Sequence, residues 1–188
     1  HNKVAPWSEY ASLIRKLTIG ANVTSISDEM FQGLYNLTEV EVPYSVTRIG
    51  ERAFANCSSL KSINIPAVSK ILKSAFSGCD SLTTINMSAV TEVGEDAFSD
   101  CISLDSLDLP NVNTIGEYAF ENCTSLTNIN IGENINKLGH YLFKGCTSLK
   151  SFTIPASVTE LSSRAFDGCT GMTHLQYNIV DLKAEFPD

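Results

Sequence analysis

The chain has 188 residues, a net charge of −8 from 13 basic and 21 acidic side chains, and 43% hydrophobic residues. This composition is typical of a folded protein, and the acidic excess argues against a surface that binds the phosphates of nucleic acid or anionic lipid. No apolar run approaches the roughly 18 residues of a membrane-spanning helix, so we expect no membrane insertion.

Residues 1–12 precede a repeating pattern that begins at residue 13. They include Trp7 and Tyr10. We expect them to cover the open end of the first repeat as an N-terminal cap, because stacked repeats need capped ends. Residues 13–188 are then expected to form the repeat array itself, a single domain that a longer chain could continue.

From residue 13 onward, the same pattern returns every 22 or 23 residues. One phenylalanine marks each repeat, at Phe31, Phe54, Phe76, Phe98, Phe120, Phe143 and Phe166. The cysteines keep the same frame, at Cys57, Cys79, Cys101, Cys123, Cys146 and Cys169. This period lies in the range of leucine-rich repeats, whose units bury their apolar side chains only when they stack.

Each repeat is expected to begin with a short strand. After Leu60, the residues Ile63 and Ile65 alternate with polar ones, which is the pattern of a strand with one inward face. Equivalent stretches from 14–19 to 172–177 give about eight strands. We therefore predict an α/β fold: a right-handed leucine-rich-repeat solenoid with one short parallel strand in each 22- to 23-residue repeat, about 4.8 Å from its neighbour.

The rest of each repeat carries a second extended segment, with Val68 and Ile71 inward, and a bend opposite the strand. Residues 95–98 are expected to form a single helical turn that buries Ala97 and Phe98. Before each cysteine stands a residue type that tolerates the left-handed conformation at the end of such a turn. These residues are Asn56, Gly78, Asp100, Asn122, Gly145 and Gly168.

The stretches "SVTRIGERAFANCSSLKSINIP" and "NVNTIGEYAFENCTSLTNINI" resemble the BspA-like, Treponema-type leucine-rich repeats. The resemblance covers roughly residues 13–178. Members of this family are secreted or surface-attached proteins of host-associated bacteria and of some parasitic protists, and some are adhesins for matrix proteins or other microbes. The resemblance therefore implies a secreted or cell-surface location and a role in adhesion.

Two interpretations of the six cysteines are open. An even number in an oxidising compartment is compatible with disulfides. However, all six occupy one column, and stacked equivalents project in parallel rather than toward one another. Leu34 takes the same slot in the first repeat, so we prefer buried free thiols that act as small hydrophobic side chains.

The sequence contains no catalytic or cofactor-binding motif. His1, His140 and His174 are tied to no nucleophile motif, and neither a CxxC pair nor a pair of histidines is present to bind a metal. Acidic residues such as Glu95 and Asp96 suggest either a calcium face or carboxylates at the positive end of a helical turn, and we prefer the second. We expect no enzymatic activity, no cofactor and no metal.

The outward positions of the strands form two polar columns, which we take as the candidate ligand face. Short side chains there would allow a partner's backbone or a sugar to approach closely, although a merely solvated sheet face is an equal alternative. Tyr44, Tyr118 and Tyr141 offer another contact edge. The candidate face consists of Glu39, Glu41, Ser62, Asn64, Thr84, Asn86, Ser106, Asp108, Asn128, Asn130, Ser151 and Thr153.

These observations favour a non-enzymatic recognition or adhesion module, secreted or on the cell surface. Its partner would be an extracellular protein or a glycan, and the family resemblance points to a host matrix protein. The alternative is a structural spacer, or a self-associating scaffold within a larger surface protein.

Overall fold

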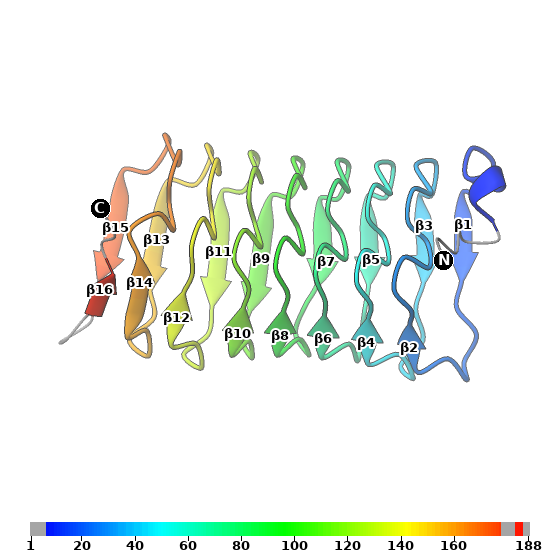
Figure 1. Ribbon diagram of the computed structural model, residues 1–188, viewed down its shortest axis with the longest axis horizontal. Helices are drawn as coiled ribbons and strands as arrows, with labels where there is room; N and C mark the ends of the chain where they lie inside the picture. Colours follow the sequence, from blue (N-terminus) through cyan, green and yellow to red (C-terminus); the bar gives the residue numbers. More distant parts are fainter. Residues whose placement is uncertain (1–6, 178–182, 186–188) are drawn as a thin grey trace.

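The computed structural model describes residues 7–177 and 183–185. Figure 1 shows the repeats stacked in one row along the longest axis, with the described N-terminal residues at one end and the C-terminal strands at the other. A single helical element, the 3-10 turn η1 (Ser8–Tyr10), precedes the first strand, and the rest of the described chain consists of strands and bends. This arrangement is the predicted parallel solenoid.

One face of the solenoid is formed by eight strands, one from each repeat. Equivalent residues lie side by side, as in the pairs Ser62 with Thr84 and Ile63 with Ile85, and each described pairing is parallel. The prediction of about eight strands is therefore confirmed. The strands are β1 (Lys16–Thr18), β3 (Glu39–Glu41), β5 (Ser62–Asn64), β7 (Thr84–Asn86), β9 (Ser106–Leu109), β11 (Asn128–Ile131), β13 (Ser151–Ile154) and β15 (His174–Tyr177).

The second extended segment of each repeat also pairs with its neighbours, so a repeat contributes two strands rather than the predicted one. Each of these strands is short, and a buried residue such as Ile49 or Ile71 anchors it to the core. This second row consists of β2 (Ser25–Ile26), β4 (Arg48–Ile49), β6 (Lys70–Ile71), β8 (Glu92–Val93), β10 (Thr114–Ile115), β12 (Lys137–Leu138), β14 (Glu160–Ser162) and β16 (Lys183–Glu185).

The helical turn predicted over residues 95–98 is wrong. Asp96 has a φ of 54°, which a right-handed helix excludes. The bend instead directs its N–H groups toward the next repeat: Asp96 donates to the carbonyl of Glu117 at 3.0 Å, and Phe98 to that of Ala119 at 2.8 Å. Bonds between repeats thus satisfy the backbone groups that a helix would have paired internally, and the bend has no helix dipole to attract carboxylates.

The prediction of a left-handed residue before each cysteine is confirmed, since the residues at these six positions have φ values between 57° and 74°. A second left-handed position occurs four residues earlier in each of five repeats. It is occupied by Arg52, Ser74, Asp96, Tyr118 and Tyr141. In these five repeats, two left-handed residues per bend therefore replace the expected helical turn.

The core is a set of continuous columns, of which the phenylalanine column is the largest. Phe54, Phe76, Phe98, Phe120 and Phe143 are fully buried. Successive rings stack with centroids 5.3 to 5.8 Å apart between Phe54 and Phe143. Because each ring packs on the next, no single repeat can bury its own phenylalanine, as expected for a solenoid.

At the N-terminal end, Trp7 continues this column. Its ring stacks on Phe31 with centroids 5.3 Å apart, and its Nε1 donates to the carbonyl of Met30 at 2.7 Å. In the next repeat the equivalent carbonyl, that of Ala53, accepts from the backbone N–H of Phe31. Trp7 thus stands where the phenylalanine of a preceding repeat would lie. The extent of the cap, residues 1–12, stays a prediction, and 1–6 lie outside the described residues.

The cysteines line a second buried column and are free thiols, as preferred from the sequence. Each Sγ donates to the carbonyl of the phenylalanine one repeat back, for example Cys101 to Phe76 at 3.2 Å. Equivalent bonds along the column run from 3.0 to 3.3 Å. The column projects in parallel, so the sulfurs contact carbonyls rather than one another.

Candidate functional site

All twelve residues of the candidate ligand face lie on the outward side of the first row of strands and are exposed. The register brings them into two straight columns, with Asn64 beside Asn86 and Asn130 beside Asp108. Alternation explains this placement, because the residues between them point into the core. The sequence therefore predicted the position of these side chains correctly, while their role as a ligand face stays a prediction.

The acidic end of the face is already engaged in contacts. Lys16 Nζ forms ion pairs with the carboxylates of both Glu39 and Glu41, and the Thr18 hydroxyl donates to Glu41 at 3.0 Å. These hydrogen bonds lower the pKa of Glu41 and raise that of Lys16. Because Lys16 offsets one of the two negative charges, the glutamates offer a partner less negative charge than the sequence suggested.

The middle of the face is short-chained and carries one carboxylate, that of Asp108. Asn130 Nδ2 donates to Asp108 Oδ1 at 2.7 Å, and Asn86 Oδ1 accepts from the backbone N–H of Ser88. No side-chain hydrogen bond to another described residue engages the remaining polar side chains of the middle and C-terminal strands. These are Ser62, Asn64, Thr84, Ser106, Asn128, Ser151 and Thr153. The face therefore presents a row of available donors and acceptors.

One hollow of about 410 Å³ adjoins this face near its N-terminal end, where β3 runs into the following loop. Its lining includes Glu41 and Asn64 from the candidate face, together with Val42 and Pro43. The sequence pattern did not predict this hollow. The only hint was the extra residue of the 23-residue repeats, which falls next to Pro43.

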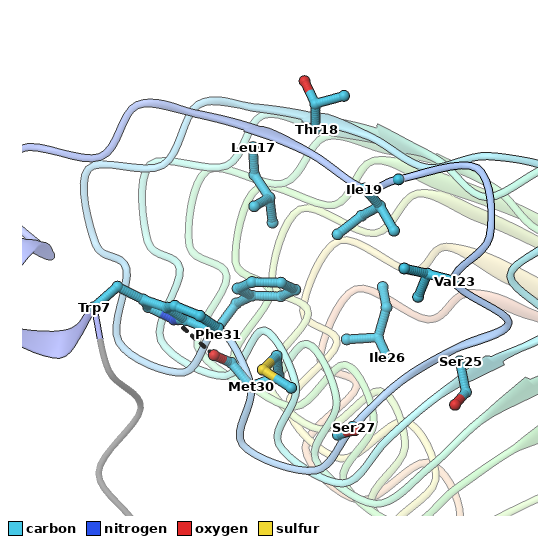
Figure 2. Close-up of a pocket in the computed structure, with 11 residues that line it drawn as sticks. Trp7, Leu17, Thr18, Ile19, Val23, Ser25, Ile26, Ser27, Met30 and Phe31 are labelled. Carbon is cyan, nitrogen blue, oxygen red and sulfur yellow. Dashed lines mark hydrogen bonds between the residues drawn. The ribbon is translucent and has the colours of Figure 1, made fainter.

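A second hollow, of about 330 Å³, opens at the N-terminal end of the core (Figure 2). Leu17, Ile19, Val23 and Ile26 line one side of it, and Trp7 stacked on Phe31 lines the other. No titratable side chain is among the described residues that line it. This hollow is an apolar space at the first repeat and offers no group for acid–base chemistry.

The structure brings together one serine and one histidine that the sequence did not connect. The Ser162 hydroxyl and His140 Nδ1 are 2.7 Å apart, and the same hydroxyl accepts from the N–H of Arg164 at 3.2 Å. Ser162 is buried and stands in the glycine slot of its repeat. In the described part of the chain no carboxylate is hydrogen bonded to His140, so the pair ties two repeats together without the third group of a catalytic triad.

Burial makes the thiols poor nucleophiles. It raises the pKa of Cys57 to about 12 and holds those of Cys79, Cys101 and Cys123 well above the usual range. Only the thiolate attacks or binds metal. Within residues 7–177 and 183–185, no three histidine, cysteine or acidic side chains lie together as a metal site, and no helix is long and apolar enough to cross a membrane.

The BspA type leucine rich repeat region family matches the chain in six copies, over residues 9–123 and 69–181. The chain belongs to this family. Repeats of this kind generally mediate protein interactions and are generally non-enzymatic.

Three solved structures of bacterial repeat proteins are similar to this chain. A leucine-rich repeat protein from Bacteroides ovatus ATCC 8483 is 32% identical over 87% of this chain and 45% of its own, with a TM-score of 0.82. The T. pallidum leucine rich repeat protein is 26% identical over 91% and 73%, with a TM-score of 0.67. A leucine rich cell surface protein from Faecalibacterium prausnitzii A2-165 is 29% identical over 87% and 60%, with a TM-score of 0.50.

The chain therefore spans less than half the length of the Bacteroides ovatus protein. A comparison with curated proteins finds no match.

Proposed function

We propose that this chain is a non-enzymatic recognition module, secreted or displayed on a cell surface, that binds an extracellular protein or glycan through the first row of strands. The observation that carries the proposal is the pair of exposed polar columns along the first row of strands. The interaction role of leucine-rich repeats and the cell-surface description of the Faecalibacterium prausnitzii protein support it.

The binding region is proposed to lie over β5 to β13 rather than over β1 and β3. Lys16 already pairs with the two glutamates of β3, whereas most polar side chains of the later strands carry no side-chain partner among the described residues. A partner that replaces water there gains hydrogen bonds without first breaking ion pairs. Short side chains also let a peptide backbone or a sugar ring lie close to the sheet.

The test uses bulky substitutions on the face and a matched control off it. Ser106→Arg with Asn128→Arg blocks the centre of the face, while Thr114→Arg places the same side chain on β10, at an exposed site in the same repeat as Ser106. A panel of extracellular-matrix proteins and a glycan array are screened for binding. We expect the double variant to lose any detected binding and Thr114→Arg to retain it. Equal binding by both variants, or no ligand in either screen, contradicts the proposal.

A structural spacer that self-associates is the second candidate. It is favoured by the apolar side chains exposed on β15, where Leu175 is 45% and Tyr177 47% exposed. Sedimentation of the unmodified chain and of Leu175→Ser distinguishes the two functions. If the unmodified chain associates and Leu175→Ser does not, the scaffold function is supported. If the unmodified chain is a monomer at all concentrations, the scaffold function is contradicted.

A further inference from the structure

The left-handed position at the start of each bend changes character along the solenoid. Its occupants are polar or charged in the first repeats and aromatic in two later ones: Glu29, Arg52, Ser74, Asp96, Tyr118 and Tyr141. Arg164 takes the equivalent place in the following repeat, without a positive φ. A bulky side chain at positive φ carries strain that small or polar residues largely avoid. The two tyrosines here have φ values of 57° and 55°, so their backbone is strained. Packing alone does not explain why tyrosine stands at these positions.

These tyrosines form a stack with two cations. The rings of Tyr118 and Tyr141 are parallel to within 15°, with centroids 5.0 Å apart. Lys144 Nζ lies 5.3 Å and the guanidinium carbon of Arg164 5.7 Å from the centre of the Tyr141 ring, and Arg164 also donates to the Tyr141 hydroxyl. The rings are half-buried and Arg164 is exposed, so the stack is an ordered surface feature rather than part of the core.

The charges of this stack are balanced at Lys144 but not at Arg164. Lys144 Nζ pairs with Glu121 at 2.7 Å. No described carboxylate lies within 4.0 Å of Arg164, although the chain as a whole is acidic. Arg52, in the same row, pairs with both Glu29 and Glu51. Arg164 is thus held in place by an aromatic ring while most of its donors face no anion of the described chain.

We propose that the stack of Tyr118, Tyr141 and Arg164 is a docking site for an acidic segment of a partner protein, with a carboxylate of that segment bound by the Arg164 guanidinium. The guanidinium fork matches a carboxylate, and tyrosine and arginine are the residues most enriched in binding hot spots. A sugar fits less well, because it needs an open ring face and Tyr141 has Tyr118 stacked on it and two cations close by.

This site is separate from the strand face, so its test does not depend on the proposed function. The probe is a capped nine-residue peptide with two glutamates among leucines, titrated into the ¹⁵N-labelled chain, and the same peptide with glutamines is the control. We expect amide shifts confined to the region of residues 118–164, with a Kd of about 1 mM or below. The glutamine peptide should bind at least about tenfold more weakly, because it cannot form a charge-assisted pair with Arg164.

Serine variants keep the fold because Ser74 already occupies this row. Arg164→Ser and Tyr141→Ser should each weaken binding of the glutamate peptide by about tenfold or more, while Arg52→Ser, in the same row and outside the stack, should leave it unchanged. Thermal melting confirms that each variant is folded. The proposal is overturned if the glutamate peptide causes no shifts up to about 10 mM, if the glutamine peptide binds equally, or if Arg52→Ser weakens binding as much as Arg164→Ser does.

Discussion

Gly94 shows how closely neighbouring repeats approach one another. A Cβ at this residue would lie 2.6 Å from the backbone nitrogen of Lys73 and 2.7 Å from the carbonyl carbon of Leu72. Both contacts are with backbone, which cannot move aside as a flexible side chain could. The glycine is therefore required by packing between repeats.

Gly94→Ala should lower the free energy of unfolding by about 1–3 kcal/mol, the usual cost of forcing a methyl group into a packed site. Gly20→Ala is the matched control, because nothing lies within 4 Å of its added Cβ, and it should change stability by no more than about 0.5 kcal/mol. Urea denaturation measures both. Similar losses in the two variants would mean that intrinsic backbone preferences, rather than the neighbouring repeat, explain the glycine.

The buried thiols make stability depend on alkaline pH. Burial raises the pKa of Cys57 from 9.0 to about 12 and that of Cys169 to about 11, so an unfolded chain loses these protons before the folded one does. The unfolded state then binds fewer protons, and stability must fall as pH rises. We expect it to be constant below about pH 9 and to decline above it, by up to about 1.4 kcal/mol per pH unit for each thiol.

Denaturant midpoints measured between pH 7 and 11 check this prediction. Cys57→Ala loses packing at every pH and is therefore less stable throughout. Above pH 9, however, its free energy of unfolding should fall less steeply with pH, because one titrating group is gone. Parallel curves for the variant and the unmodified chain would show that other groups cause the decline.

At the scale of one structural element, the phenylalanine column should carry much of the stability. Phe76 is fully buried between Phe54 and Phe98, with centroids 5.4 and 5.3 Å away. Phe76→Ala should cost about 3–5 kcal/mol because it removes a buried aromatic ring and leaves a cavity. Thr84→Ala, on the exposed side of β7, should stay within about 0.5 kcal/mol. Equal effects in a denaturation series would contradict the inward and outward assignment of these columns.

Trp7 makes two separable contributions to the first repeat. Trp7→Phe keeps an aromatic ring on Phe31 but loses the bond to the Met30 carbonyl, and it should cost about 1 kcal/mol. Trp7→Ala loses both contacts and should cost clearly more. Chemical denaturation compares the two variants. Indistinguishable losses would assign the whole effect to the hydrogen bond.

Much of the first sheet could be predicted because its information is local and repeated. Ile63 and its equivalents alternate with polar residues, and the period places each of them beside the next. The bend could not be predicted in this way, since the left-handed conformation of Asp96 depends on hydrogen bonds to the following repeat. A run such as Glu95 to Phe98 is compatible with a helical turn when it is considered alone.

For the candidate ligand face, exposure was predictable and chemistry was not. Strand alternation places Glu39 and Glu41 outward, but only the folded stack shows that Lys16, 23 residues earlier than Glu39, forms ion pairs with them both. The stack at Tyr141 likewise joins residues from three repeats. A repeat sequence predicts well which side chains line each column. A partner, however, is recognised by groups of side chains from several repeats, and no single repeat contains such a group.

At the scale of the whole molecule, stability should vary along the solenoid because each repeat contacts only its neighbours. The central repeats bury their phenylalanines completely, whereas Phe166, Cys169 and Met172 are only partly buried and β15 is exposed throughout. Local opening needs less energy where fewer apolar contacts must be broken.

Amide hydrogen exchange should therefore be slowest at the centre and fast at β15. The N–H of Phe98, bonded to the Ala119 carbonyl, should exchange at least about 100-fold more slowly than that of His174, bonded to Lys150. The amide of Phe31, on which Trp7 stacks, should exchange at a rate between these two. Mass spectrometry or NMR at neutral pH measures all three. Equal protection at Phe98 and His174 would show that the repeats open as one cooperative unit rather than from the less buried end.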